Sequence, residues 1–154
     1  MLPIIERAAG APEATSITSD GLGGGTWAEV TDVVLRLAEA IRRHPLGGVR
    51  RVLVIARNRP STVIAHAAAL LGEASSVPVN FHLTAGEIEY QADESRAGLA
   101  FVDSATEAAA SEALAGKDVT VVRLPDAGVT GPELEAFLDG IPPVTLRPDQ
   151  PVVP

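Results

Sequence analysis

The chain has no cysteine among its 154 residues. This absence excludes disulfide bonds, thiolate catalysis and zinc sites built on cysteine. Aromatic residues are also scarce, at 3% of the chain, so Ala, Val, Leu and Ile have to fill most of any core. The apolar fraction of 46% is nevertheless large enough for one ordinary domain.

Long apolar runs and an excess of positive charge are missing as well. The longest mainly apolar run covers residues 63–71 and includes His66, whereas a helix that spans a bilayer needs about 20 such residues. Residues 1–6 lack the basic start and long apolar stretch of a secretory signal. A net charge of −8 argues against a nucleic-acid partner. We therefore expect a soluble, cytoplasmic protein without a transmembrane segment.

Four short segments read as strands: residues 51–56, 75–79, 98–102 and 119–123. They are mostly apolar rather than alternating, which is typical of strands covered on both faces. Helical segments separate them, as in right-handed βαβ crossovers. The sequence therefore predicts an α/β fold with a mainly parallel sheet of four or five strands and helices on both faces. We expect the strand at 51–56 to be central.

The first part of the chain has a different pattern. Residues 1–13 are weakly patterned, and we expect them to be partly mobile. Residues 14–19 and 25–27 flank a glycine-rich turn at 20–24, which indicates a small antiparallel hairpin. The alternative, a phosphate-binding loop, needs a buried apolar strand before it. The preceding residues are mostly Ser and Thr, so the hairpin is favoured.

Helix starts are marked by the spacing of hydroxyl and glutamate residues. In a capping box, a Ser or Thr at the helix start exchanges hydrogen bonds with a Glu three residues later. Four pairs have this spacing: Thr26 with Glu29, Thr84 with Glu87, Ser104 with Glu107, and Thr130 with Glu133. A fifth helix is expected to begin at Pro60. This helix, at about 60–72, is apolar on nearly all sides and should be the most buried.

The segment 52–103 resembles the N-terminal subdomain of the AMP-forming acyl-activating enzymes. These include acyl-CoA synthetases, the adenylation domains of peptide synthetases, and luciferases. Pro78-Val-Asn80 and Thr84-x-x-Glu87-x-x-Tyr90 are similar to the family pattern "VPLNxxLTxxELxY". Two local departures are Gly72-Glu73 before the second strand, where the family has Ala-Gly, and Arg59 in place of a Ser or Thr before Pro60.

The resemblance implies an enzyme that uses ATP to activate a carboxylic acid, in our interpretation a fatty acid. The acid becomes an acyl-adenylate and then a CoA thioester, with ATP, Mg and CoA as cofactors of the parent enzyme. In the family, a segment like residues 146–151 leads to a strand and then to a lysine-containing loop that holds the ATP phosphates. The chain ends at Pro154 without that loop.

We therefore expect residues 1–140 to form the N-terminal α/β subdomain, and residues 141–154 to form a proline-rich extended arm toward the missing ATP-binding part. This fragment alone is expected to be inactive and to hold no catalytic, cofactor-binding or metal-binding residue. Its partners would be the remainder of the parent enzyme and the acyl substrate. Without that remainder an apolar face should be exposed, through which a homodimer could form.

The candidate site residues are Asn80, Phe81 and His82, which follow the second strand. Ligands of open parallel sheets collect beyond the carboxyl ends of the strands. The resemblance places this loop near the acyl group, so these side chains are candidates for lining the substrate. The alternative is an ordinary turn in which the asparagine closes the strand and the phenylalanine plugs the core.

Two further features have alternative interpretations. Seven of the eleven arginines lie between Arg36 and Arg59, and they indicate either a patch that attracts anions such as CoA or solvated side chains near a helix end. His66 reads as a hydrogen-bonded core histidine rather than a catalytic base. Two other hypotheses remain for the whole chain. One is a stand-alone, non-catalytic α/β interaction module, and the other is a nucleotide-binding domain of the flavodoxin or Rossmann kind. The latter lacks a glycine loop after residues 51–56.

Overall fold

The computed structural model describes residues 2–143. In chain order the elements are α1 (Leu2–Gly10), β1 (Thr15–Ser19), β2 (Gly23–Thr26), α2 (Trp27–Arg43), β3 (Arg51–Ile55), α3 (Pro60–Leu71), β4 (Ser75–Pro78), α4 (Ala85–Ser95), β5 (Leu99–Val102), α5 (Glu107–Ala113), β6 (Thr120–Arg123) and α6 (Pro132–Phe137). Residues 141–143 belong to no helix or strand, and the rest of the predicted arm lies outside the described residues. Within the described residues, no helix is long and apolar enough to cross a membrane.

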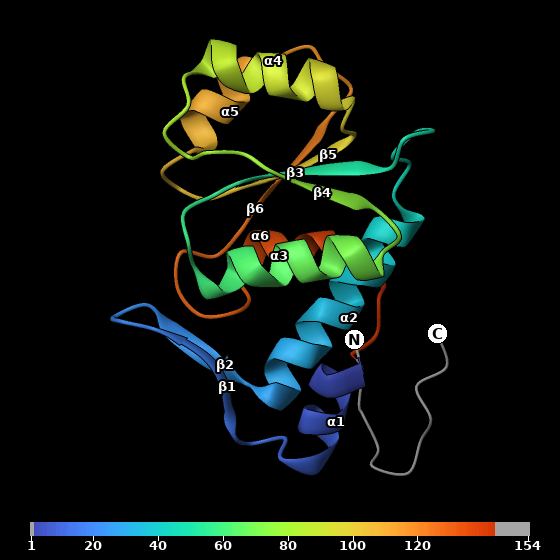
Figure 1. Cartoon of the computed structure of the whole chain (residues 1–154), viewed down its shortest axis with the longest axis vertical. Helices are drawn as coiled ribbons and strands as arrows, with labels where there is room; N and C mark the ends of the chain where they lie inside the picture. The colour runs from blue at the N-terminus through green and yellow to red at the C-terminus, as the bar shows by residue number, and fades with distance from the viewer. Residues whose placement is uncertain (1, 144–154) are drawn as a thin grey trace.

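The main sheet has four parallel strands in the order β4-β3-β5-β6 (Figure 1). The predicted α/β class, the parallel sheet and the central position of β3 are confirmed, because β3 pairs with both β4 and β5. Val52 lies opposite Ser76 on one side and Leu99 on the other. Each predicted strand matches an observed one to within a residue at either end.

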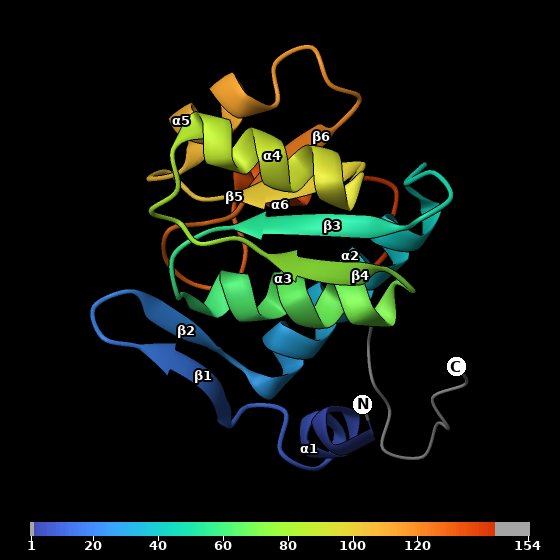
Figure 2. The ribbon, with the colours of Figure 1, turned by 45° about the horizontal axis from the view of Figure 1, so that its top comes forward.

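Helices cover both faces of this sheet. Helices α2, α3 and α6 lie on one face, and α4 with α5 lie on the other (Figures 1 and 2). Along β3, Val52 and Val54 belong to the core under the first group, whereas Leu53 and Ile55 belong to the core under the second. Both sets of side chains are buried, one under each layer of helices. This explains why the strand is apolar throughout rather than alternating.

The N-terminal segment forms a separate two-stranded antiparallel sheet from β1 and β2. Gly21 and Gly23 adopt positive φ angles of 68° and 71° in the turn, a conformation that costs glycine little. The predicted hairpin is therefore confirmed, and the glycines shape its turn. The chain then enters α2, whose first turn is closed by the Glu29 carboxylate, which accepts from the Thr26 amide at 2.8 Å.

The predictions about helices were only partly correct. No helix was predicted within residues 1–13, which we expected to be partly mobile, but α1 occupies Leu2–Gly10 and its Ala8 is buried. The capping boxes of Thr26 and Thr84 are confirmed. Those of Ser104 and Thr130 are not, because α5 is capped at Thr106 and α6 at Gly131. The Ser104 hydroxyl instead donates to Asp126, and the Thr130 hydroxyl donates to Glu135.

Arg50 joins the carboxyl ends of α2 and α3. Its guanidinium donates to the carbonyls of Ile41 at 3.1 Å and Gly72 at 3.1 Å. A cation at a helix C-terminus satisfies carbonyls that have no partner within the helix and interacts favourably with the helix dipole. One side chain therefore fixes the two helices against each other. The outer side of α3 still exposes Val63 and Leu70, so this helix is apolar all round but buried on one side only.

Candidate functional site

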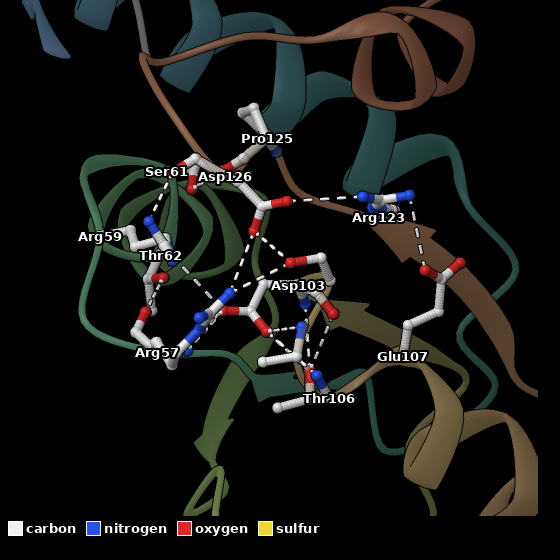
Figure 3. Close-up of polar contacts among 12 residues, drawn as sticks. Arg57, Arg59, Ser61, Thr62, Asp103, Thr106, Glu107, Arg123, Pro125 and Asp126 are labelled. Atoms are coloured by element: carbon white, nitrogen blue, oxygen red, sulfur yellow. Dashed lines mark hydrogen bonds and ion pairs between the residues drawn. The ribbon is translucent and has the colours of Figure 1, made fainter. Parts of the chain in front are cut away.

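The sheet reverses its winding between β3 and β5. From β3 the chain moves outward to β4, and it then crosses back to β5 on the other side of β3. In open α/β sheets, ligands bind in the crevice beyond the carboxyl ends of the two strands at such a point. Here those ends are followed by Arg57 after β3 and Asp103 after β5. Figure 3 shows that these two side chains point toward each other.

Asp103 is the buried centre of this arrangement, with a side chain that is 1% exposed. Its Oδ2 accepts from the Arg57 Nε at 2.7 Å and from the Arg57 amide at 3.1 Å. The Arg59 Nε lies 3.6 Å from the same oxygen. A buried carboxylate needs charged and hydrogen-bonding partners of this kind to offset its lost hydration. Asp103 therefore ties the β3–α3 turn to the end of β5.

The second carboxylate oxygen of Asp103 organises the chain that follows β5. Oδ1 accepts from the amides of Ala105 at 3.0 Å and Thr106 at 3.1 Å. By accepting from the amides two and three residues later, Asp103 caps the turn of residues 104–106 that leads into α5. The Thr106 hydroxyl also donates to the Ile55 carbonyl on β3. The start of α5 is thus attached to the central strand.

Asp126, in the loop after β6, extends the network outward (Figure 3). Its Oδ1 accepts from the Ser104 hydroxyl at 2.7 Å and from the Arg57 guanidinium at 3.2 Å. Its Oδ2 accepts from Arg123 at 3.4 Å, and its backbone carbonyl accepts from Arg59 at 2.6 Å. The loops after β3, β5 and β6 are therefore joined by one set of charges.

The electrostatics of the network keep its carboxylates ionised. Burial by itself would raise the pKa of Asp103, but the hydrogen bonds from Arg57 and Ala105 outweigh it and hold the pKa below its ordinary value. The pKa of Asp126 is lowered as well, first by the Ser104 hydroxyl. Neither carboxylate is therefore suited to accept a proton near neutral pH, which argues against a role in general acid–base chemistry.

The network also fills the place where a nucleotide would bind in a flavodoxin-like or Rossmann-like sheet. The β3–α3 turn consists of Arg57, Asn58 and Arg59 before Pro60, and it contains no glycine whose backbone could approach a phosphate. In residues 2–143 no group of three or more histidine, aspartate or glutamate side chains could hold a metal ion. These observations oppose the nucleotide-binding hypothesis for this crevice.

The predicted site residues lie apart from this network, beyond the end of the edge strand β4. Asn80, Phe81 and His82 are all exposed. The Asn80 Oδ1 accepts from the His82 amide at 3.0 Å, and the rings of Phe81 and His82 lie 4.1 Å apart. Asn80 therefore does shape a turn, but Phe81 does not plug the core. The structure brings the three side chains together at the surface, and their role in binding an acyl group stays a prediction.

A shallow open pocket of about 300 Å³ lies between the hairpin and α3. Ile17, Asn58, Val63 and His66 are among its lining residues. The His66 Nδ1 lies 2.6 Å from the Ser76 hydroxyl, and burial lowers the pKa of His66. His66 is therefore a half-buried, hydrogen-bonded histidine that joins α3 to β4, as its sequence context suggested.

The seven arginines between Arg36 and Arg59 do not form a free cationic patch, although Arg42 and Arg43 are exposed to solvent. Each one donates a hydrogen bond to a carboxylate or to a backbone carbonyl. Arg36, for example, binds Glu135 at 2.9 Å, 99 positions away in the sequence. The free anion-attracting patch is therefore not found, whereas the preference for helix ends holds for Arg42 and Arg43 in the last turn of α2 and for Arg50 at the ends of α2 and α3.

A family model for AMP-binding enzymes matches residues 4–153. The chain belongs to the AMP-binding enzyme family. This confirms the family resemblance found in the sequence. A comparison with curated protein sequences finds no significant match.

Several solved structures share the fold of this chain. The chain is similar to a benzoate CoA ligase from Burkholderia xenovorans, with a TM-score of 0.77 and 19% identity over 97% of this chain and 30% of that one. It is similar to the N-terminal domain of FACL13 from Mycobacterium tuberculosis, with a TM-score of 0.68 and 20% identity over 97% of this chain and 37% of that one. An o-succinylbenzoate CoA synthetase from Bacillus subtilis, in complex with its acyl-adenylate intermediate, gives a TM-score of 0.62 and 22% identity over 93% of this chain and 34% of that one. The chain thus spans about a third of the length of these three proteins.

Proposed function

We propose that the chain is the N-terminal part of an AMP-forming acid–CoA ligase, which activates a carboxylic acid as an acyl-adenylate and transfers it to CoA. The observation that carries the proposal is the family match along residues 4–153. The likeness to a benzoate CoA ligase and to an o-succinylbenzoate CoA synthetase supports it. The resemblance in the sequence points further, to a fatty acid as the substrate.

ATP, Mg and CoA are the cofactors that this activity needs. The described residues do not fit the phosphates or the metal, because the crevice at β3 and β5 is occupied by Arg57, Asp103 and Asp126 and no cluster of metal ligands is present in residues 2–143. We assign the binding and activation of ATP to another part of the parent enzyme. The 154-residue chain itself supplies the parallel sheet and the loop at Asn80, Phe81 and His82, and we assign this loop to the binding of the acyl group.

A stand-alone interaction module is the second candidate function. Val63 and Leu70 are seven residues apart on α3, which is about two helical turns, so they lie on the same side of the helix. Their side chains are 56% and 66% exposed. Two large apolar side chains on the same side of a helix are typical of a surface that another polypeptide covers. The ligase proposal explains the same exposure, since the remainder of the parent enzyme would provide that cover.

Acid-dependent exchange of pyrophosphate into ATP distinguishes these functions. The 154-residue chain is assayed beside the product of its complete gene, with benzoate and palmitate as alternative acids and heat-killed protein as the control. We expect exchange with the complete product, and none with the chain alone, because within residues 2–143 the crevice beyond β3 and β5 is filled by Arg57, Asp103 and Asp126 rather than by a phosphate-binding loop. Exchange by the chain alone would contradict the proposal. A folded complete product that is inactive with a broad panel of acids would favour the interaction module.

A further inference from the structure

Arg36 on α2 joins parts of the chain that are far apart in the sequence. Its Nη1 and Nη2 donate to the two carboxylate oxygens of Glu135 on α6, at 3.3 Å and 2.9 Å. Its Nε donates to the backbone carbonyl of Ile141, at 3.2 Å. Its own helix supplies Asp32, whose carboxylate lies 3.6 Å from Nη1. One side chain therefore connects α2 both to α6 and to the turn that follows α6.

The geometry of this contact is stricter than that of an ordinary surface ion pair. The Arg36 side chain is only 12% exposed, so water competes little for its hydrogen bonds. A guanidinium is planar, and its donors are fixed in one fork. Glu135 takes the two terminal nitrogens and the Ile141 carbonyl takes the third, so α6 and residue 141 are oriented together. Lysine has a single charged nitrogen and cannot hold both partners in this arrangement.

The backbone around residue 141 can transmit an orientation. Gly140 has a φ of 75°, a left-handed conformation that turns the chain after α6. Ile141 is followed by Pro142 and Pro143. A residue before a proline is restricted to extended conformations, and consecutive prolines form a semi-rigid spacer. The orientation that Arg36 gives to residue 141 is therefore carried to the end of the proline pair.

Other contacts keep this region folded without fixing its direction. Leu134 and Leu138 are fully buried and hold α6 on the sheet. The Ile141 amide donates to the Leu138 carbonyl at 3.1 Å, which ties residue 141 to the end of its own helix. Helix α6 has only six residues, so its exact placement depends on packing and side-chain contacts. Loss of the Arg36 contacts should therefore leave the domain folded and let the turn move relative to α2.

We infer that Arg36 is a positioning residue, which sets the direction in which the chain leaves the α/β domain after α6. Its role in the reaction rests on the proposed function, in which the loop at Asn80, Phe81 and His82 holds the acid and a later part of the enzyme holds ATP. The two substrates react only when these two parts are correctly oriented, and the chain through residue 141 connects them. Arg36 acts through this placement and touches neither substrate.

Distances between spin labels test the orientation without reference to activity. Because the chain has no cysteine, Glu112→Cys on the exposed side of α5 and Val144→Cys directly after the two prolines can be labelled specifically. Pulsed electron spin resonance on this 154-residue chain should give one narrow distance distribution. Arg36→Gln and Arg36→Lys should both broaden it, because the turn is no longer held to α2. Arg43→Gln is the matched control and should leave it unchanged, since Arg43 is exposed and bonds Glu39 on its own helix at 2.8 Å.

A broad distribution in the chain with Arg36 intact would overturn the inference, and so would equal widths in Arg36→Gln and Arg43→Gln. Should Arg36→Gln fail to fold, Glu135→Gln serves as the second variant. It keeps the size of the side chain but removes its charge, so the contact with Arg36 is weakened while the bond to Ile141 remains. The distribution should broaden less than in a folded Arg36 variant, and no broadening would again contradict the inference.

The same substitutions in the complete gene product test the consequence for the reaction. Arg36→Gln should lower the kcat of acid-dependent pyrophosphate exchange about tenfold, because small displacements of reacting groups are costly. The KM values for the acid and for ATP should stay unchanged, since the contacts of both ligands are intact. A residue that only supported the fold would reduce the amount of folded enzyme and leave kcat per folded molecule unchanged.

The outcomes separate the positioning role from the proposed function. Unchanged kcat in Arg36→Gln, beside an active enzyme with Arg36 intact, would overturn the positioning role and leave the ligase function standing. A complete product that is folded and inactive with Arg36 intact would overturn the ligase function, and with it the role of Arg36 in the reaction. The spin-label distances would still decide whether Arg36 sets the direction of the chain.

Discussion

The carboxyl ends of β5 and β4 lie at the same edge of one sheet but are built in opposite ways. After β5, the buried carboxylate of Asp103 uses both of its oxygens, with Arg57 on one and two backbone amides on the other. After β4, the exposed side chains of Phe81 and His82 contact mainly each other. Charged side chains at the position where open sheets usually bind ligands can therefore serve to hold loops together instead. The more strongly charged end holds the loops together, and the more open end retains side chains that are free to contact something else.

The largest effect is expected from breaking the Asp103 network. Asp103→Ala leaves the Arg57 and Arg59 guanidinium groups without their central partner and removes the cap of the turn before α5. Removing one member of a buried ion pair costs about 3 kcal/mol, so we expect a loss of about this size in the free energy of unfolding. Urea melts at neutral pH measure it. Asp103→Asn, which keeps an oxygen that can accept from Ala105 and Thr106, should lose less. Equal losses in the two variants would show that the cap contributes nothing beyond the ion pair.

The same comparison can be sharpened by pH. The pKa of Asp103 in the folded chain is below its ordinary value, so its contribution is fully present above the unfolded value of about 3.9 and is lost as pH falls through the lower folded value. The difference in unfolding free energy between the unchanged chain and Asp103→Asn should therefore be constant from neutral pH to about pH 5 and shrink below about pH 4. Other carboxylates titrate in both proteins, and the difference removes their shared contribution. A difference that grew on acidification would contradict this account.

The sequence predicted the sheet well because local patterns specify it. The apolar segments at β3 and β5 mark buried strands, and the Thr84 cap with Glu87 marks the start of α4. The network could not be predicted in the same way, because Arg57 and Asp103 are 46 positions apart and meet only after folding. A local signal was nevertheless available. Asp103 directly precedes Ser104 and is a residue type that often caps turns. The sequence analysis instead predicted that Ser104 caps the helix together with Glu107.

Helix α1 shows another limit of the sequence. Ile4, Ile5 and Ala8 have helical spacing, but the segment is short and contains a proline. Such a helix depends on packing more than on its own propensity. Ala8 is in fact buried, and α1 contacts α2. A short N-terminal helix of this kind becomes visible only once the surface that it covers is known.

A smaller effect is expected at the helix start that follows the open loop. The Glu87 carboxylate accepts from the Thr84 amide at 2.9 Å and from the Thr84 hydroxyl at 2.8 Å. Thr84→Ala should reduce the free energy of unfolding by about 1 kcal/mol, as for other helix caps. Glu73→Ala is the control, because Glu73 is exposed and its ion pair with Arg42 spans 3.7 Å, so its effect should be near zero. Identical urea midpoints for the two variants would mean that the Thr84 cap does not stabilise α4.

The smallest effect on stability is expected in the loop itself. His82→Ala removes an exposed ring whose neighbour is Phe81, so the free energy of unfolding should change by no more than about 0.5 kcal/mol. If this loop lines the acyl group, as we propose, the same substitution in the complete gene product should raise the KM for the acid and leave the KM for ATP unchanged. A residue that only supported the fold would instead lower the amount of active enzyme and leave both KM values alone. Steady-state kinetics with benzoate and palmitate, beside Glu73→Ala as the surface control, separate the two cases. Unchanged KM values for both acids in His82→Ala and in Phe81→Ala would remove this loop from the substrate site and place the acyl group against another part of the enzyme.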